Sequence, residues 1–291
     1  MIIAIPTNNV NRYSEVPGRT QNAAYVKYVH DAGFTPVLIP MESASNVVAK
    51  MADGLLLAGG VDIDPLHYNE SNYASFGVDP QKDAAERELF YAFKDIGKPI
   101  FGICRGFQLI FRELLYTHED SDEYNDYFEY IENIGEHSQT SNLKVPRSFP
   151  SHQVRANVRA LYNLSEEQLE GNSPLQMIAV NSMHHQAVIC NFAYALNVLV
   201  PGLPKSKNNE PIIQKFLDVD LLAWSMRGIT QPTKKLGNRK VPDYDNFYTV
   251  VEAARINNWN SPIMGVQWHP EELRDIELIH NFFTRNTVAV G

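Results

Sequence analysis

Short apolar runs alternate with helical patterns over the first 116 residues of the chain. The apolar runs, which predict β-strands, cover residues 2–6, 35–40, 55–60 and 98–104. The segments that predict helices cover residues 23–33, 44–54, 79–96 and 105–115. Because strands and helices alternate in this way, the pattern indicates a doubly wound α/β fold, with a mostly parallel central sheet and helices on both faces.

Beyond about residue 150 the chain becomes rich in predicted strands. These segments cover residues 176–180, 194–200, 221–226, 247–255 and 262–270, and a final helix is expected from about Glu271 to Arg285. We therefore expect a small strand-rich extension of the parallel sheet, within a single domain that spans residues 1–291.

Two polar segments interrupt this pattern. Residues 117–150 begin with an acid-rich stretch, which indicates a solvated loop rather than a cation site. Residues 227–246 are polar and locally basic, and they predict a long surface loop between two strands. Long loops in compact domains are often lids or docking elements, and simple mobility is an equal alternative.

The composition limits the classes of partner. The chain has 291 residues and a formal net charge of −9 at pH 7, a balance that repels phosphate backbones. Small molecules or proteins are therefore the expected partners, and nucleic acid is not. The 2 cysteines form no CxxC pair and no HExxH string occurs, so neither a disulfide framework nor a metal site is expected. The first apolar run is short and lacks a basic flank, which favours a cytoplasmic protein without a membrane span.

One cysteine lies where the fourth predicted strand ends and the next helix begins. Cys104 has Gly102 and Gly106 two residues to either side, a spacing similar to that of the GxSxG nucleophile elbow. A side chain at the carboxyl end of a parallel strand projects into the crevice where open α/β sheets bind ligands. The start of the following helix favours a thiolate there. The glycine spacing alone does not distinguish such a nucleophile from a small buried filler.

A histidine far along the chain supplies a candidate base. His269 ends an apolar run and is followed by Pro270 and Glu271. Proline favours extended geometry at the residue before it, and in an extended segment residues i and i+2 project to the same side. Glu271 is therefore expected to reach the imidazole of His269. A lone histidine at a strand end is more often structural, but together with Cys104 the pair predicts a Cys-His-Glu triad.

Paired glycines, Gly59 and Gly60, end the third predicted strand. Their backbone amides are not shielded by a Cβ atom, so they are candidates for an oxyanion site facing the thiolate. An ordinary glycine turn explains the pair equally well when it is considered alone.

The segments AGG, GICRGFQ and WHPE occur in this order, and together they resemble the class I glutamine amidotransferase-like hydrolases. The chain is most similar to the gamma-glutamyl-GABA hydrolase family, also grouped as gamma-glutamyl peptidases, because the intervening segments match as well. These segments are AGGVDIDPLHY, DPQKDAAERELFYAF and AVNSMHHQAV. The similarity extends from residue 1 to about residue 286, and the loops at 117–150 and 227–246 have no clear counterpart. The second of these stands where the family usually has a short hairpin.

This resemblance implies a role for individual residues. It makes Cys104 the nucleophile, His269 the general base and Glu271 the residue that orients the base. It also implies an oxyanion hole made by the backbone amides of Gly60 and Arg105, although a surface position at a helix start is an alternative for the Arg105 side chain. The residues implied to line the substrate pocket are Gly59, Gln108, Asn181, Ser182, His184 and His185, with His185 preferred over His184 for substrate contact.

The implied reaction is hydrolysis of the γ-glutamyl amide bond of a small molecule such as γ-glutamyl-GABA, through a glutamyl thioester and without a cofactor or metal. The alternative is a glutaminase subunit that acts on glutamine and supplies ammonia to a separate synthetase, for which residues 227–246 are a candidate docking surface. A catalytically silent binding module on the same fold is disfavoured, because all three triad residues are present. A homodimer is compatible with either enzyme.

Overall fold

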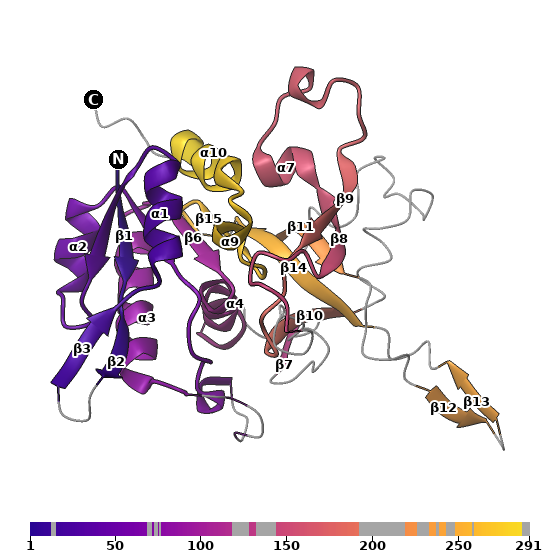
Figure 1. Cartoon of the computed structure of the whole chain (residues 1–291), viewed down its shortest axis with the longest axis horizontal. Coiled ribbons are helices and arrows are strands. Elements are labelled where there is room, and N and C mark those ends of the chain that lie inside the picture. Colours follow the sequence, from indigo (N-terminus) through magenta and orange to yellow (C-terminus); the bar gives the residue numbers. More distant parts are fainter. Residues whose placement is uncertain are drawn as a thin grey trace.

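The computed structural model describes residues 1–12, 16–68, 72, 75, 77–117, 128–131, 144–191, 219–225, 233–236, 239–242, 248–257 and 259–286. Within these ranges a sheet of 11 strands runs through the molecule, and two hairpins form small sheets of their own (Figure 1). Helices lie against this sheet, so the architecture is the expected α/β fold.

Five strands form the parallel half of the main sheet. In spatial order they are β4 (Thr35–Ile39), β1 (Ile2–Pro6), β5 (Gly54–Leu57), β6 (Ile100–Ile103) and β15 (Ile263–Val266). Every neighbouring pair in this series is parallel. The first four strands confirm the predicted ones, with ends that differ by a few residues. The fifth, β15, comes from near the end of the chain and lies directly beside β6.

The remaining strands of the main sheet are antiparallel to their neighbours. Beyond β15 they follow as β14 (Tyr248–Ile256), β11 (Val219–Ser225), β8 (His152–Asn157) and β9 (Leu175–Val180), while β10 (Ala187–Asn191) joins β14 to β7 (Phe128–Ile131). This part of the sheet is the predicted strand-rich extension, in which β9, β11 and β14 match predicted strands, whereas β7, β8 and β10 were not predicted. The strand predicted at 194–200 lies outside the described residues.

Two hydrophobic cores fill the space between the sheet and the helices. The side chains of α2 (Ser45–Met51), α3 (Pro80–Asp95) and α4 (Arg105–Thr117) belong to one core. Those of α1 (Ala23–Asp31) and α10 (Ile276–Asn286) belong to the other. Helices therefore cover both faces of the parallel half, as the alternating sequence pattern predicts.

Local signals in the sequence account for where the helices begin and end. The Asn22 side chain accepts a hydrogen bond from the amide of Ala24 and caps α1. Asp79 accepts from the amides of Gln81 and Lys82 and caps α3, with Pro80 in its first turn. Gly33, just after α1, has a φ of +85°, the left-handed conformation that glycine adopts without strain.

The final helix departs from its prediction. The segment expected to form one helix contains two, α9 (Pro270–Leu273) and α10, separated at Arg274, which has a φ of +57°. The left-handed residue ends the first helix and redirects the chain. The expected start, at about Glu271, lies within one residue of the observed start at Pro270, but nothing in the apolar spacing marked the break.

Further elements were not predicted. β2 (Asn8–Arg12) and β3 (Val16–Thr20) pair as a hairpin after β1, and β7 lies inside the segment 117–150 that was expected to be a loop. Within the segment 227–246, β12 (Thr233–Leu236) and β13 (Arg239–Pro242) form a hairpin. Short helical turns complete the described chain at Pro65–Tyr68, Val158–Tyr162 and Glu167–Leu169.

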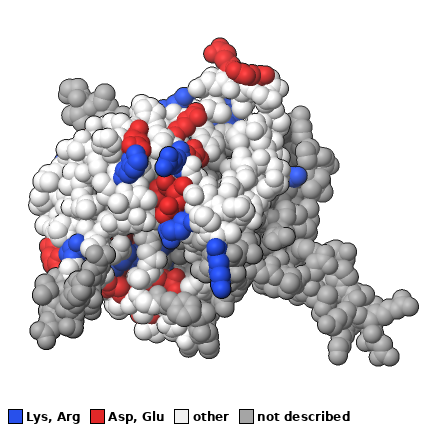
Figure 2. Space-filling model, viewed as in Figure 1, with Lys and Arg blue, Asp and Glu red and all other residues white. Residues whose placement is uncertain are grey.

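The charged surface is mixed on the face that Figure 2 shows. Acidic and basic side chains of the described residues alternate there over a largely uncharged background. Over the described parts of the chain, no helix combines the length and the hydropathy needed to cross a membrane.

Candidate active site

Cys104 occupies a strained turn between β6 and α4. Its φ is +52°, in the left-handed region that a residue with a side chain adopts only at a cost. The backbone holds it there, since its amide donates to the Val266 carbonyl at 2.8 Å and its own carbonyl accepts from the Gln108 amide at 3.0 Å. The cysteine is thus fixed at the carboxyl end of a parallel strand, as the elbow prediction required.

The glycines on either side of Cys104 allow α4 to approach the sheet closely. A Cβ atom on Gly106 would lie 2.0 Å from the backbone oxygen of Leu57 in β5. One on Gly102 would lie 2.7 Å from the backbone nitrogen of Phe107. The steric requirement is therefore at the glycines, while the unusual dihedral angle is at the cysteine itself.

His269 and Glu271 form a buried pair beside the cysteine. His269 follows β15 and immediately precedes α9, and its Nδ1 lies 2.7 Å from Oε1 of Glu271. Both residues are at most 5% exposed. The imidazole and Cys104 lie against the same glycine, because a Cβ atom on Gly59 would lie 3.0 Å from Cε1 of His269 and 3.5 Å from Cβ of Cys104. The structure thus brings together the three residues that the sequence analysis proposed as a triad.

The charges around His269 favour its protonated form. Burial lowers the pKa of His269, but the charges of Glu271 and Cys104, together with the hydrogen bond to Glu271, outweigh burial and raise this pKa to about 10. At neutral pH the site therefore favours an imidazolium next to the sulfur atom. A protonated imidazole at this position can provide a proton for a leaving group.

Asn181 anchors the backbone of His269. Its Oδ1 accepts from the His269 amide at 2.9 Å, and its Nδ2 donates to the His269 carbonyl at 3.1 Å and to the Arg147 carbonyl at 2.8 Å. The sequence analysis assigned Asn181 to the substrate pocket. The structure places both ends of its amide group on the main chain, where the side chain holds the backbone of the candidate base.

Tyr25 is a site residue that the sequence analysis missed. Its hydroxyl accepts from the Gly59 amide at 3.0 Å and lies 3.2 Å from Nδ1 of His269. Burial first, and then the charges of Glu271 and Cys104, raise the pKa of Tyr25 well above its ordinary value, so the hydroxyl stays neutral. Tyr25 occupies an apolar position of the α1 pattern and is therefore indistinguishable from a core residue in the sequence.

The hydrogen bond to Tyr25 also decides the role of Gly59. Its amide is already committed, so Gly59 is not a free donor, and a Cβ atom here would lie 2.4 Å from the Tyr25 hydroxyl and 3.0 Å from Cε1 of His269. Gly59 thus lies against the catalytic histidine candidate. The neighbouring amide of Gly60 and that of Arg105 remain the proposed oxyanion donors.

Gln108 lies in a buried hydrogen-bond network one turn into α4. Its Nε2 donates to the Gln186 carbonyl at 2.8 Å and to Oε1 of Gln267 at 3.2 Å. The hydroxyl of Tyr130 donates to Oε1 of Gln186 at 2.8 Å. Gln108 is only 2% exposed. Gln108 is therefore buried in the first turn after Cys104, where it holds the loop of residues 181–186 through the Gln186 carbonyl.

That loop places the two candidate histidines differently. Nδ1 of His184 lies 2.9 Å from the Gln186 carbonyl, and the residue is 4% exposed. Nε2 of His185 lies 2.9 Å from Oδ2 of Asp62, and the His185 side chain is 18% exposed. Ser182, in the same loop, is fully buried. Of the two histidines, His185 is the one that reaches Asp62, in the loop after Gly60, from a partly open position.

The Arg105 side chain does not lie on the surface, contrary to one of the alternatives considered for it. It is 1% exposed and pairs with Asp83 and Glu86 of α3.

Among the residues that the structure describes, no group of three histidine, cysteine or acidic side chains is arranged to hold a metal ion.

Comparisons with known proteins agree with this geometry at the level of the family. The model of the Peptidase C26 family matches residues 1–199. The glutamine amidotransferase-like protein YvdE of Lactococcus lactis is 27% identical over 213 residues, which are 69% of this chain and 79% of that protein. The glutamine amidotransferase-like protein RP404 of Rickettsia prowazekii is 27% identical over 267 residues, or 90% of this chain and 86% of that protein.

Among solved structures, the glutaminase domain of Trypanosoma brucei CTPS with bound acivicin overlaps with 98% of this chain and 93% of its own, with a TM-score of 0.48 and 10% identity. The family match covers well over half of the chain and includes the cysteine elbow, whereas His269 and Glu271 lie beyond it. The chain belongs to the Peptidase C26 family, whose members are class I glutamine amidotransferase-like hydrolases.

Proposed function

We propose that the protein is a cysteine hydrolase that cleaves the γ-glutamyl amide bond of a small molecule. The observation that carries this proposal is the arrangement around Gly59 of Cys104, held at a φ of +52°, and His269, whose Nδ1 lies 2.7 Å from Glu271. A nucleophile, a base and an orienting carboxylate in this order form the arrangement required for acyl transfer.

The first half of the reaction forms a thioester. The Cys104 thiolate attacks the δ-carbonyl carbon, a carbon–sulfur bond forms, and the carbonyl oxygen becomes an oxyanion. The amides of Gly60 and Arg105 are proposed to stabilise that oxyanion. The His269 imidazolium gives its proton to the departing nitrogen, the carbon–nitrogen bond breaks, and the free amine leaves.

The second half consumes water. The neutral imidazole accepts a proton from a water molecule as its oxygen attacks the thioester carbon. The tetrahedral intermediate collapses, the carbon–sulfur bond breaks, and glutamate is released from the sulfur. The thiolate and the imidazolium are thereby restored, so the cycle requires only amide and water.

The test measures turnover by the purified protein alone on γ-glutamyl-GABA and on glutamine. We expect turnover of the γ-glutamyl amine, and complete loss of turnover in Cys104→Ser. Cys190→Ser is the matched control, because Cys190 is fully buried in the core and burial raises its pKa, which disfavours the thiolate. Cys190→Ser should retain full activity.

A glutamine-analogue electrophile provides a second readout. We expect mass spectrometry to find the adduct on Cys104 and not on Cys190. Slow turnover of glutamine alone, without turnover of γ-glutamyl amines, would instead favour the glutaminase subunit. No turnover and no adduct would contradict both enzymes.

A further inference from the structure

Four buried charges lie next to the proposed oxyanion site. Lys82, Asp83 and Glu86 project from the first turns of α3, and Arg105 is the first residue of α4. None of the four is more than 3% exposed. Lys82 pairs with Glu86, and the two terminal nitrogens of Arg105 pair with Glu86 and Asp83. We call these four residues the ionic cluster.

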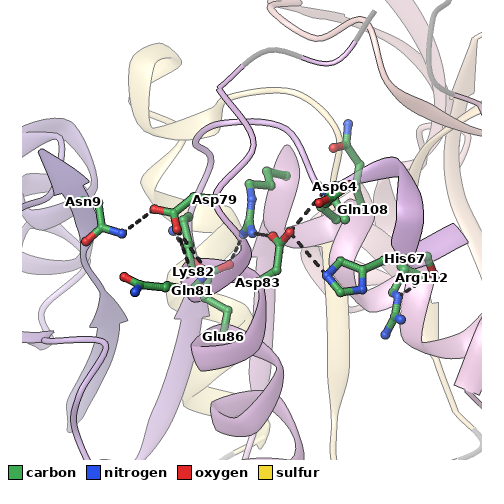
Figure 3. A network of polar contacts seen from close by, with 12 residues as sticks. Asn9, Asp64, His67, Asp79, Gln81, Lys82, Asp83, Glu86, Gln108 and Arg112 are labelled. Atoms are coloured by element: carbon green, nitrogen blue, oxygen red, sulfur yellow. Dashed lines mark hydrogen bonds and ion pairs between the residues drawn. The ribbon is translucent and has the colours of Figure 1, made fainter. Parts of the chain in front are cut away.

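The ionic cluster contacts the loop after Gly60 as well as the turn at Cys104. Oδ2 of Asp83 accepts from the Asp64 amide at 3.1 Å, four residues beyond Gly60, and lies 3.6 Å from Nε2 of His67. In Figure 3, His67 and Asp64 lie on one side of Asp83 and Lys82 and Glu86 on the other. The Asp83 carboxylate thus contacts both the loop after Gly60 and the side chain of Arg105, the residue after Cys104.

The side chains of Lys82 and Arg105 lie against Gly60 itself. A Cβ atom on Gly60 would lie 3.2 Å from Cε of Lys82 and 3.7 Å from Cδ of Arg105. The aliphatic parts of both cations therefore pack against the backbone of Gly60. The two amides proposed as oxyanion donors, of Gly60 and Arg105, are both held by the same set of side chains.

Stability alone does not account for so many buried charges. Taking ions out of water is costly, and apolar side chains of similar volume are often at least as stabilising. The ionic cluster contains two cations and two anions, so it adds no net charge beside the thiolate. An effect on catalysis would therefore come from geometry rather than from electrostatic activation of the sulfur.

We propose that Lys82, Asp83 and Glu86 are positioning residues that fix the spacing between the amides of Gly60 and Arg105. This proposal rests on the proposed function. Donors of an oxyanion hole act on charge that develops in the transition state. Their displacement lowers kcat while substrate binding in the ground state is little changed.

The central test is Glu86→Gln, which keeps the shape of the side chain and removes the charge that both cations share. Glu88→Gln is the matched control, because Glu88 lies on the same helix and is exposed. We expect Glu86→Gln to lower kcat by about 10- to 100-fold with KM changed by less than about twofold. Glu88→Gln should leave both parameters unchanged.

Two further measurements separate positioning from other roles. We expect the pH profile of Cys104 alkylation by iodoacetamide to be the same in Glu86→Gln and wild type, because the thiolate itself is not perturbed. We also expect the backbone amides in a peptide covering residues 59–64 to exchange faster in Glu86→Gln than in wild type. Glu88→Gln should exchange at the wild-type rate. A shifted alkylation profile, or unchanged kcat and exchange, would overturn the proposal.

A second variant covers the case in which Glu86→Gln fails to fold. Lys82→Met combined with Glu86→Gln keeps the buried charges balanced, and the same results are expected from it. Failure of both variants to fold would identify the ionic cluster as a requirement of the fold and overturn a positioning role. If wild type turns over no γ-glutamyl amide, the proposed function fails, while amide exchange and alkylation still report on the ionic cluster.

Discussion

The side-chain amide of Asn181 holds the backbone of His269 on both sides of its Cα atom, accepting from the amide nitrogen at 2.9 Å and donating to the carbonyl oxygen at 3.1 Å. Asn181 directly follows β9, at the far edge of the antiparallel extension, whereas His269 follows β15 in the parallel half. The extension therefore contributes to the site by fixing the candidate base, even though none of the triad residues lies on it.

Removal of the Asn181 side-chain amide should disturb the position of His269 while the protein still folds. We expect Asn181→Ala to lower kcat by about tenfold or more, because misplacement of a reacting group by a fraction of an ångström is costly. The buried amide of His269 would also lose its partner, which costs about 1–3 kcal/mol of unfolding free energy. Steady-state kinetics and urea unfolding measure the two effects, with the exposed residue Asn172, replaced by alanine, as the control.

Tyr25 and Tyr28 provide a matched pair on α1. Both hydroxyls are hydrogen bonded, that of Tyr25 to Gly59 and His269, and that of Tyr28 to the carbonyl of Asp275 at 2.7 Å. We expect both tyrosine-to-phenylalanine variants to lose about 1 kcal/mol of unfolding free energy or somewhat more. Only Tyr25→Phe should lower kcat. Equal kcat in the two variants would show that the Tyr25 hydroxyl has no part in the reaction.

The raised pKa of His269 predicts the direction of a pH effect on stability. The folded protein holds this proton up to a pKa of about 10, whereas an unfolded histidine releases it near its ordinary value of 6.5. The stabilisation is therefore complete below pH 6.5 and is lost as the pH rises toward 10. The slope due to this group is at most about 1.4 kcal/mol per pH unit.

Urea unfolding between pH 6 and 10 measures this effect. His269→Gln should flatten the decline relative to wild type. A decline of equal steepness in the variant would assign it to other groups.

Gly106 and Gly60 should respond differently to replacement by alanine. A Cβ atom on Gly106 meets the backbone oxygen of Leu57 at 2.0 Å, which cannot move without shifting β5 or α4. On Gly60 the nearest atoms, at 3.2 Å, belong to the side chains of Asn8 and Lys82. We expect Gly106→Ala to lose about 3 kcal/mol or more of unfolding free energy, and Gly60→Ala to remain folded with reduced kcat. Thermal unfolding and kinetics distinguish them.

The sequence predicted the parallel half of the fold well because its signals are local. Alternating apolar runs, the Asp79 cap and the glycine after α1 each act within a few residues. The proposed triad residues were also accessible from the sequence, since Cys104 and His269 each lie at the end of a predicted strand. No local signal in the sequence predicted that β15 lies beside β6.

The missed residues share a physical reason. Tyr25 has an apolar position in an amphipathic helix, and only its hydroxyl, 3.2 Å from His269, reveals a polar role. Lys82, Asp83 and Glu86 would be expected at the surface, as charged residues near a helix start usually are. Their burial depends on Arg105, which lies on another helix, so no pattern within α3 could indicate it.

The pairing of β6 with β15, in which Ile100 lies opposite Ile263, has a consequence for the order of events during synthesis. The sulfur-bearing turn emerges from the ribosome long before the strand that carries the imidazole. A nascent chain therefore holds its thiol without the proposed proton acceptor, His269, until nearly all of the polypeptide has been translated. Reactivity of Cys104 toward electrophiles would thus report that the last strand has been inserted into the sheet.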